Sequence, residues 1–60
     1  MTTGNHETLV QLFDYYLTEN EKFEETGNSA AGTRARKTLM EITRICKDRR
    51  KDIQDKKLQG

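Results

Sequence analysis

The chain has 60 residues, of which 32% are hydrophobic and 35% are charged, and its mean hydropathy is −1.03. The formal net charge is +1, but six carboxylates and one lysine give residues 1–30 a charge of −5, and ten basic and four acidic residues give residues 31–60 a charge of +6. A chain of this length forms one domain at most, and its single cysteine and single histidine leave no disulfide framework or metal clip to stabilise it.

The apolar residues are scattered in runs of two, such as Leu9-Val10. A membrane-spanning helix needs about 20 apolar residues and a signal peptide about 7–15, so the sequence predicts neither. It contains no Cys/His ligand pair, no Gly-rich phosphate loop and no nucleophile elbow. We therefore expect a protein that is not an enzyme and has no metal, no cofactor and no small-molecule substrate. His6 is expected to be a solvated surface residue, and the lone thiol suits the cytoplasm.

A first helix is predicted from about residue 6 to 26. This stretch contains no Gly or Pro, Asn5 is expected to be its N-cap, and Glu7 in the first turn complements the helix dipole. Apolar residues recur at helical spacing within an arc of about 100°. They are Leu9, Leu12, Phe13, Tyr16 and Phe23. Asn20 lies within the same arc, either buried, where it would fix register or oligomer state, or at the edge, bonded to water.

Residues 27–29 are predicted to form a turn, and a second helix is expected over about 30–57. Gly27 suits the left-handed position after a helix, and Asn28 or Ser29 suits the cap of the next one. The expected inner face of the second helix consists of Ala31, Ala35, Leu39, Ile42, Cys46 and Ile53. Because the connection is short, the helices should be antiparallel neighbours. We therefore predict an all-α helical hairpin spanning residues 1–60 as one domain, with the last turns projecting beyond it.

Self-association is expected because so polar a chain buries little apolar area against a backbone ordering cost of about 1–2 kcal/mol per residue. We predict a homodimer or larger coiled-coil-like bundle, with Cys46 as a small core residue. The predicted interface comprises Leu9, Leu12, Phe13, Tyr16, Asn20, Phe23, Leu39, Ile42, Cys46 and Ile53.

The second helix also carries a basic stripe about 20 Å long, in which Lys37, Arg44 and Lys51 recur every seven residues. Such a stripe could bind several phosphates without reading sequence, and the helix has no aromatic residue for base stacking. The alternative is a solvated helix with internal pairs such as Arg44–Asp48, each contributing a few tenths of a kcal/mol.

The segment from Phe23 to Ile42, together with Cys46 to Ile53, resembles the small bacterial linker-histone-like proteins, among them the chlamydial nucleoid-condensing protein. The shared signature is a Gly-Asn-x-Ala-Ala turn at 27–31, followed by Arg-x-Arg-Lys at 34–37, and the similarity covers about residues 19–55. The resemblance implies a helical-hairpin, nucleoid-associated DNA-binding protein of the cytoplasm. The residues that it implies would face phosphate are Arg34, Arg36, Lys37, Arg44, Lys47, Arg49, Arg50 and Lys51.

The chain departs from the chlamydial form because it stops at Gly60, without the long Lys/Ala/Pro-rich tail. A stripe of cations without this tail suits docking on a surface better than bulk condensation of DNA. Two functions follow. The first is a histone-like protein that binds DNA without sequence specificity. The alternative is a protein–protein interaction module, such as a phage-encoded modulator, that binds a host protein through its charged helix.

Overall fold

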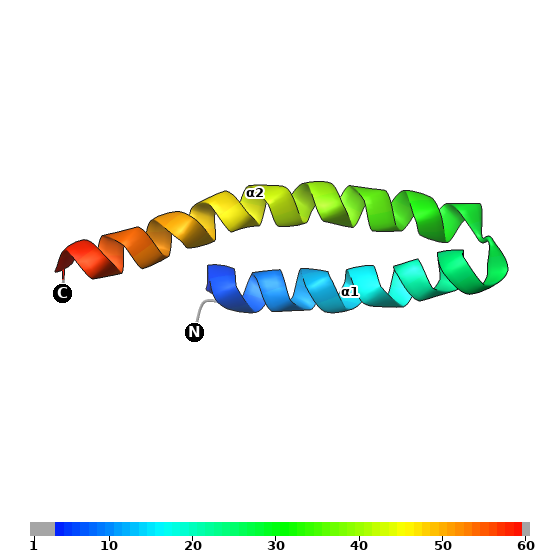
Figure 1. Cartoon of the computed structure of the whole chain (residues 1–60), viewed down its shortest axis with the longest axis horizontal. Helices are drawn as coiled ribbons and strands as arrows, with labels where there is room; N and C mark the ends of the chain where they lie inside the picture. The colour runs from blue at the N-terminus through cyan, green and yellow to red at the C-terminus, as the bar shows by residue number, and fades with distance from the viewer. Residues whose placement is uncertain (1–3, 60) are drawn as a thin grey trace.

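The computed structural model describes the backbone of residues 4–59 and the side chains of residues 4–57. It consists of two antiparallel helices, α1 (Asn5–Thr26) and α2 (Ser29–Gln59), which lie side by side (Figure 1). The molecule measures 48 × 21 × 14 Å, so it is a single layer of two helices. The predicted all-α hairpin is confirmed, and residues 4–59 include no strand. Assembly with a second copy stays a prediction.

The N-cap of the first helix lies one residue earlier than predicted. Gly4, with extended backbone, is the N-cap, and its N–H donates to Oε2 of Glu7 at 3.0 Å. This bond satisfies one free donor at the helix start. The prediction that Asn5 is the N-cap is therefore wrong. Asn5 is the first helical residue, and its side-chain amide instead donates to Oδ2 of Asp52 on α2 at 2.9 Å.

The turn consists of Gly27 and Asn28. Gly27 has a φ of 67°, the left-handed conformation predicted for it, and its N–H donates to the Phe23 carbonyl at 2.9 Å. Of the two candidate caps for α2, Asn28 fills the role, because its Oδ1 accepts the N–H of Ala31 at 3.1 Å. A connection of two residues returns the chain directly, which makes the helices antiparallel.

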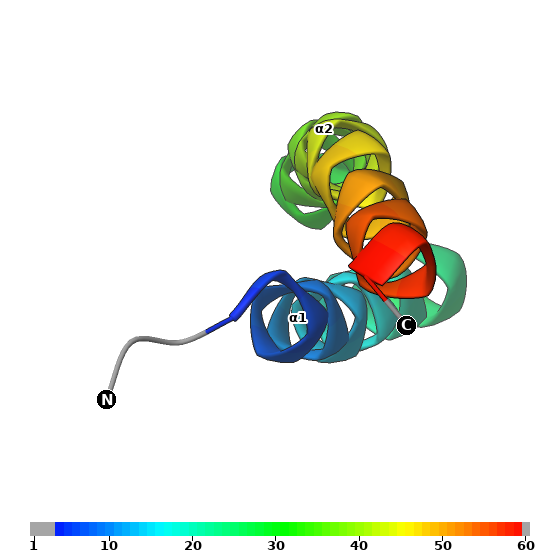
Figure 2. The ribbon, with the colours of Figure 1, turned by 90° about the vertical axis from the view of Figure 1, so that its left-hand side faces the viewer.

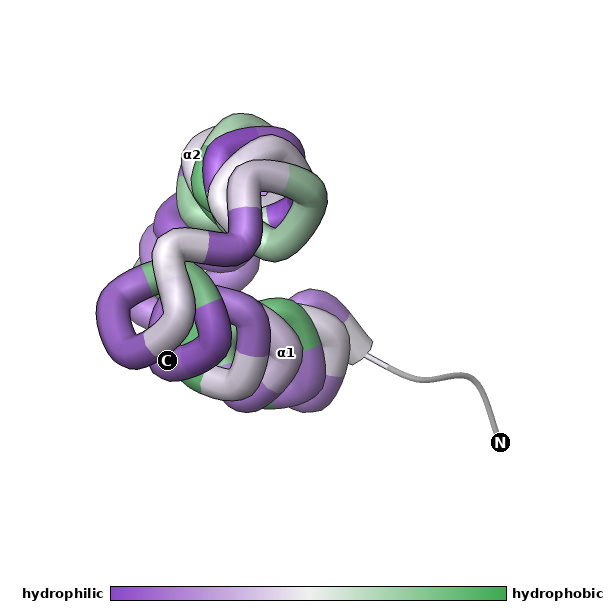
Figure 3. Tube along the Cα trace, turned by 90° about the vertical axis from the view of Figure 1, so that its right-hand side faces the viewer, coloured by the Kyte–Doolittle hydropathy of each residue, from purple (hydrophilic) through white to green (hydrophobic). Residues whose placement is uncertain are grey.

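The contact between the helices is built from small side chains. Ala31, Ala35 and Thr38 of α2 are buried, and Ile42 and Ile45 are half-buried further along the same side. Figure 3 shows apolar segments interrupting the otherwise hydrophilic tubes of both helices. Among residues 4–57, no large side chain is fully buried. The hairpin alone therefore has almost no hydrophobic core.

The predicted inner face of α2 was wrong at three positions. Leu39 and Ile53 are 44% and 47% exposed, and Cys46, although half-buried, lies in the same row as they do. Thr38, Ile45 and Arg49 occupy the inner row in their place. The inner row steps by four and three from Ala31, and Leu39, Cys46 and Ile53 form the adjacent row, seven residues apart. On α1, Phe13 and Phe23 also remain 51% and 43% exposed.

Close helix approach near the turn depends on Gly32. A Cβ added at this position would lie 2.7 Å from Cδ1 of Phe23, so the Phe23 ring covers the glycine. This contact explains why an otherwise unfavourable residue occupies the first turns of α2.

The end of α2 extends beyond α1. The Asn5–Asp52 hydrogen bond marks where α1 begins, and residues 53–59 continue past it, as predicted (Figure 1). The end-on view shows these last turns bending towards the α1 side (Figure 2). Within the described residues, no helix is long and apolar enough to cross a membrane.

Candidate nucleic-acid interface

The hairpin carries opposite charges on its two long edges. On α1, the positions turned away from α2 hold exposed carboxylates, which we call the acidic edge: Glu7, Asp14, Glu21 and Glu25. On α2, the positions turned away from α1 hold exposed cations, which we call the basic edge: Arg36, Lys37, Arg44, Lys47 and Lys51. The helical period places each set on one side of its helix, because their residues are about three, four or seven apart.

The structure divides the eight basic residues implied by the family resemblance. Five of them form the basic edge, which extends for about 22 Å between Arg36 and Lys51. Arg50 is exposed and lies at the border of this edge, because it lines one surface hollow with Lys47 and Lys51 and another with Ile53 and Lys57. Arg49 is half-buried in the inner row of α2. Five cations are therefore free to meet a polyanion as a group.

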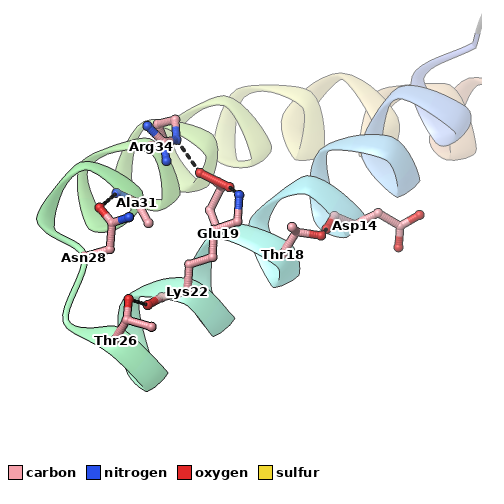
Figure 4. Close-up of polar contacts among 8 residues, drawn as sticks. All are labelled: Asp14, Thr18, Glu19, Lys22, Thr26, Asn28, Ala31 and Arg34. Carbon is pink, nitrogen blue, oxygen red and sulfur yellow. Dashed lines mark hydrogen bonds and ion pairs between the residues drawn. The ribbon is translucent and has the colours of Figure 1, made fainter.

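Arg34 is occupied by an interaction within the hairpin. Its Nε donates to Oε1 of Glu19, and Nζ of Lys22 lies 3.2 Å from Oε2 of the same carboxylate (Figure 4). The Glu19 residue is only 3% exposed. Burial of a carboxylate is costly unless it is paired, and here two cations compensate it. Arg34 therefore joins α2 to α1.

The same contacts change the acidity of both groups. The hydrogen bond from Arg34 holds the pKa of Glu19 below its ordinary value, because it favours the ionised carboxylate, and the Lys22 contact acts in the same direction. The hydrogen bond to Glu19 correspondingly raises the pKa of Arg34. Both groups are therefore charged at neutral pH.

Sequence reasoning missed Glu19. A charged residue on an amphipathic helix is expected at the surface, so its hydrophobic pattern gave no signal. A signal was present in the hairpin register: residues at similar distances before and after a tight turn face each other, which places Glu19 opposite Arg34. Lys22, three residues along the same helix, completes the cluster.

A row of carboxylates borders the basic edge on one side. Glu41 and Asp48 lie beside Arg44 on a broad face of the hairpin, around Leu12 and Ile45. Met40 lies within the basic edge and is the most exposed of the large hydrophobic residues described, at 67%. The cationic surface is thus a narrow strip with a defined direction of approach, and not an all-round polycation.

Comparison with known families identifies a matching family model. The family model described as histone H1-like protein Hc1 matches residues 3–59, which include both helices and the whole basic edge. Neither the curated proteins nor the solved structures gave a match. Because the family model covers nearly the entire chain, the resemblance seen at residues 19–55 is confirmed and extended. The protein belongs to the histone H1-like protein Hc1 family.

Proposed function

We propose that this protein is a non-enzymatic, nucleoid-associated DNA-binding protein of the cytoplasm that contacts the phosphate backbone through its basic edge. The observation that supports this proposal is the segregation of five exposed cations on the outer side of α2, in a chain of the histone H1-like family. Lysine and arginine side chains on one helix edge reach phosphate oxygens along a duplex groove.

Binding by such an edge is electrostatic. Each phosphate that a cation neutralises releases condensed counterions, and the logarithm of the binding constant falls with the logarithm of salt by about 0.9 per phosphate contact. Five contacts give a slope of about −4.5, or roughly a 500-fold loss of affinity for a fourfold increase in salt. Phosphate contacts carry no base information, and the edge has no aromatic side chain, so random duplexes should bind equally well.

A salt titration with random duplex DNA tests the proposal. The triple variant Lys37→Gln/Arg44→Gln/Lys51→Gln leaves two cations on the basic edge, and its slope should fall to about −1.8. The matched control is Arg50→Gln/Lys56→Gln/Lys57→Gln, which removes the same charge from exposed cations of α2 at the border of the edge and beyond it.

The control should keep most of the wild-type slope. Equal slopes for the two triple variants would show that net charge, and not the basic edge, governs binding. A wild-type protein that does not bind duplex DNA at low salt would overturn the proposed function itself.

A further inference from the structure

A methionine lies at the centre of the basic edge. Met40 is 67% exposed and points away from α1, so it takes no part in the contact between the helices. Single exposed apolar residues are common on protein surfaces. Met40 differs from these in its surroundings, because three of the four side chains that neighbour it on the helix surface are cations. They are Arg36, Lys37 and Arg44.

The five cations of the basic edge divide about Met40. With a rotation of about 100° per residue, two of them lie about 20–40° to one side of Met40 around the helix, and three lie about 20–60° to the other side. The first group is Arg36 and Lys47, and the second is Lys37, Arg44 and Lys51. Within the described residues 4–57, no ion pair engages any of these five side chains. The edge therefore presents an apolar centre between two rows of charges.

The edge is also one helix thick. Ala31 and Arg49 of the inner row each lie nine residues from Met40, which is about 180° around α2, so α1 is directly behind α2 when a partner approaches Met40. The hairpin is a single layer, 14 Å in its thin direction. An α-helix with its side chains is about 10–12 Å across, and the major groove of B-DNA is about 12 Å wide, whereas the minor groove is about 6 Å wide. The basic edge therefore fits the major groove.

The major groove matches the chemical pattern of the edge. Its walls are the phosphate backbones of the two strands, and its floor consists of base edges. Side chains on the two flanks of an inserted helix reach the walls, whereas the side chain at the centre faces the floor. The apolar group that the floor presents is the C5-methyl group of thymine, which apolar side chains contact in protein–DNA complexes.

A lipid surface is another partner that combines anions with apolar groups. A helix that lies on such a surface buries a whole apolar face in it. Within residues 36–51, Met40 is the only apolar residue within about 60° of the centre of the basic edge. One methionine is sufficient to contact a base methyl group and too little to hold a helix in lipid, so the pattern favours DNA.

We propose that Met40 is a base-contacting residue: with α2 in the major groove, its side chain packs on the C5-methyl groups of thymine and gives the protein a preference for A·T-containing duplexes. This inference rests on the proposed function, in which the same edge binds phosphate. Phosphate contacts do not distinguish sequences, so random duplexes of equal thymine content still bind alike. The flexible, unbranched side chain adapts to methyl groups at different positions, so Met40 favours thymine content and not a fixed sequence.

Removing the thymine methyl group tests the proposal without changing a phosphate. Deoxyuridine pairs with adenine as thymidine does but carries hydrogen at C5. In a duplex of alternating A·T pairs, replacing every thymidine with deoxyuridine should weaken wild-type binding about fourfold, the effect of losing one buried methyl contact. Fluorescence anisotropy at a fixed salt concentration measures both affinities. The salt slope should be the same for the two duplexes, because their phosphates are the same.

Two substitutions at Met40 form a matched pair. Met40→Leu keeps an apolar side chain of similar size and should retain the discrimination between the two duplexes, whereas Met40→Gln presents an amide and should bind them equally. Because Met40 is exposed and lies opposite the inner row, both variants should keep the helical signal in circular dichroism. Methylation of cytosine at C5 in a G·C duplex adds a methyl group to the same groove and should raise wild-type affinity by a similar factor.

The outcomes separate this inference from the proposed function. Equal wild-type affinity for the thymine and uracil duplexes, with a steep salt slope on both, would overturn the contact at Met40 and leave the proposed function intact. Discrimination that survives in Met40→Gln would also overturn it, as would Met40-dependent binding to vesicles of anionic lipid without discrimination between the duplexes. A wild-type protein that binds neither duplex at low salt would overturn the proposed function, and this inference with it.

Discussion

The packing of Phe23 on Gly32 gives the sharpest prediction about stability. Gly32 is the fourth residue of α2, and replacing it with alanine should stabilise the helix by up to about 1 kcal/mol, because alanine has the higher helix propensity. The backbone N–H of Gly32 donates to the Asn28 carbonyl at 3.1 Å, and alanine keeps this donor. However, the new methyl group would lie 2.7 Å from the Phe23 ring, so the ring must move.

The cost of moving the ring follows from its burial. Phe23 is 43% exposed, so the hairpin covers somewhat more than half of it, or about 110 Å², corresponding to about 2.5 kcal/mol. Crowding of this kind costs about 1–3 kcal/mol. Combined with the helix gain, Gly32→Ala should change the free energy of unfolding by between about zero and 2 kcal/mol in the destabilising direction.

A double-mutant cycle isolates this contact. In a Phe23→Ala background there is no ring to displace, so Gly32→Ala should stabilise the protein by about 1 kcal/mol. The coupling between the two sites is then about 1–3 kcal/mol. Urea unfolding followed by circular dichroism, at one fixed protein concentration, measures all four proteins. If Gly32→Ala stabilises both backgrounds equally, the ring does not pack on Gly32, and our account of the close helix approach is wrong.

Two further predictions concern charge. The pKa of Glu19 is lowered in the folded state, so its ion pair stabilises the protein above the ordinary glutamate pKa, and this contribution is lost as the pH falls through the lowered value. The stability difference between wild type and Glu19→Gln, measured by unfolding from neutral to acidic pH, should therefore shrink on acidification; a constant difference would contradict the pairing with Arg34. Met40→Lys adds a sixth cation to the basic edge and should steepen the salt slope of DNA binding by about 0.9, whereas an unchanged slope would place DNA elsewhere.

The sequence was sufficient for the helices and their connection. The left-handed backbone at Gly27 and the cap formed by Asn28 depend only on neighbouring residues. The period of the apolar residues can likewise be read from each helix separately. The inner row of α2 was harder to predict because Leu39 and Ile53 are more apolar than Thr38. Close approach near the turn favours small side chains, so Ala31 and Ala35 fill the contact and the larger residues remain at its margin.

The candidate site was predictable to a similar extent. A repeat of seven placed Lys37, Arg44 and Lys51 together without any knowledge of α1. The positions of Arg34 and Arg49 depend on which residues the other helix presents. Arg34 meets the buried Glu19, and Arg49 follows the inner row, so neither could be assigned from α2 alone.

The two charged edges also determine the charge that a DNA duplex coated with this protein would present to its surroundings. The acidic edge lies on the far side of a molecule 21 Å wide, well beyond the Debye length of about 8 Å at physiological salt, so it does not weaken phosphate contacts at the basic edge. In the proposed mode of binding, every hairpin bound by its basic edge would point its carboxylates outward. The coated duplex would then keep a negative exterior, which would repel neighbouring duplexes and a second layer of protein. Such a coat would shield DNA without cross-linking it.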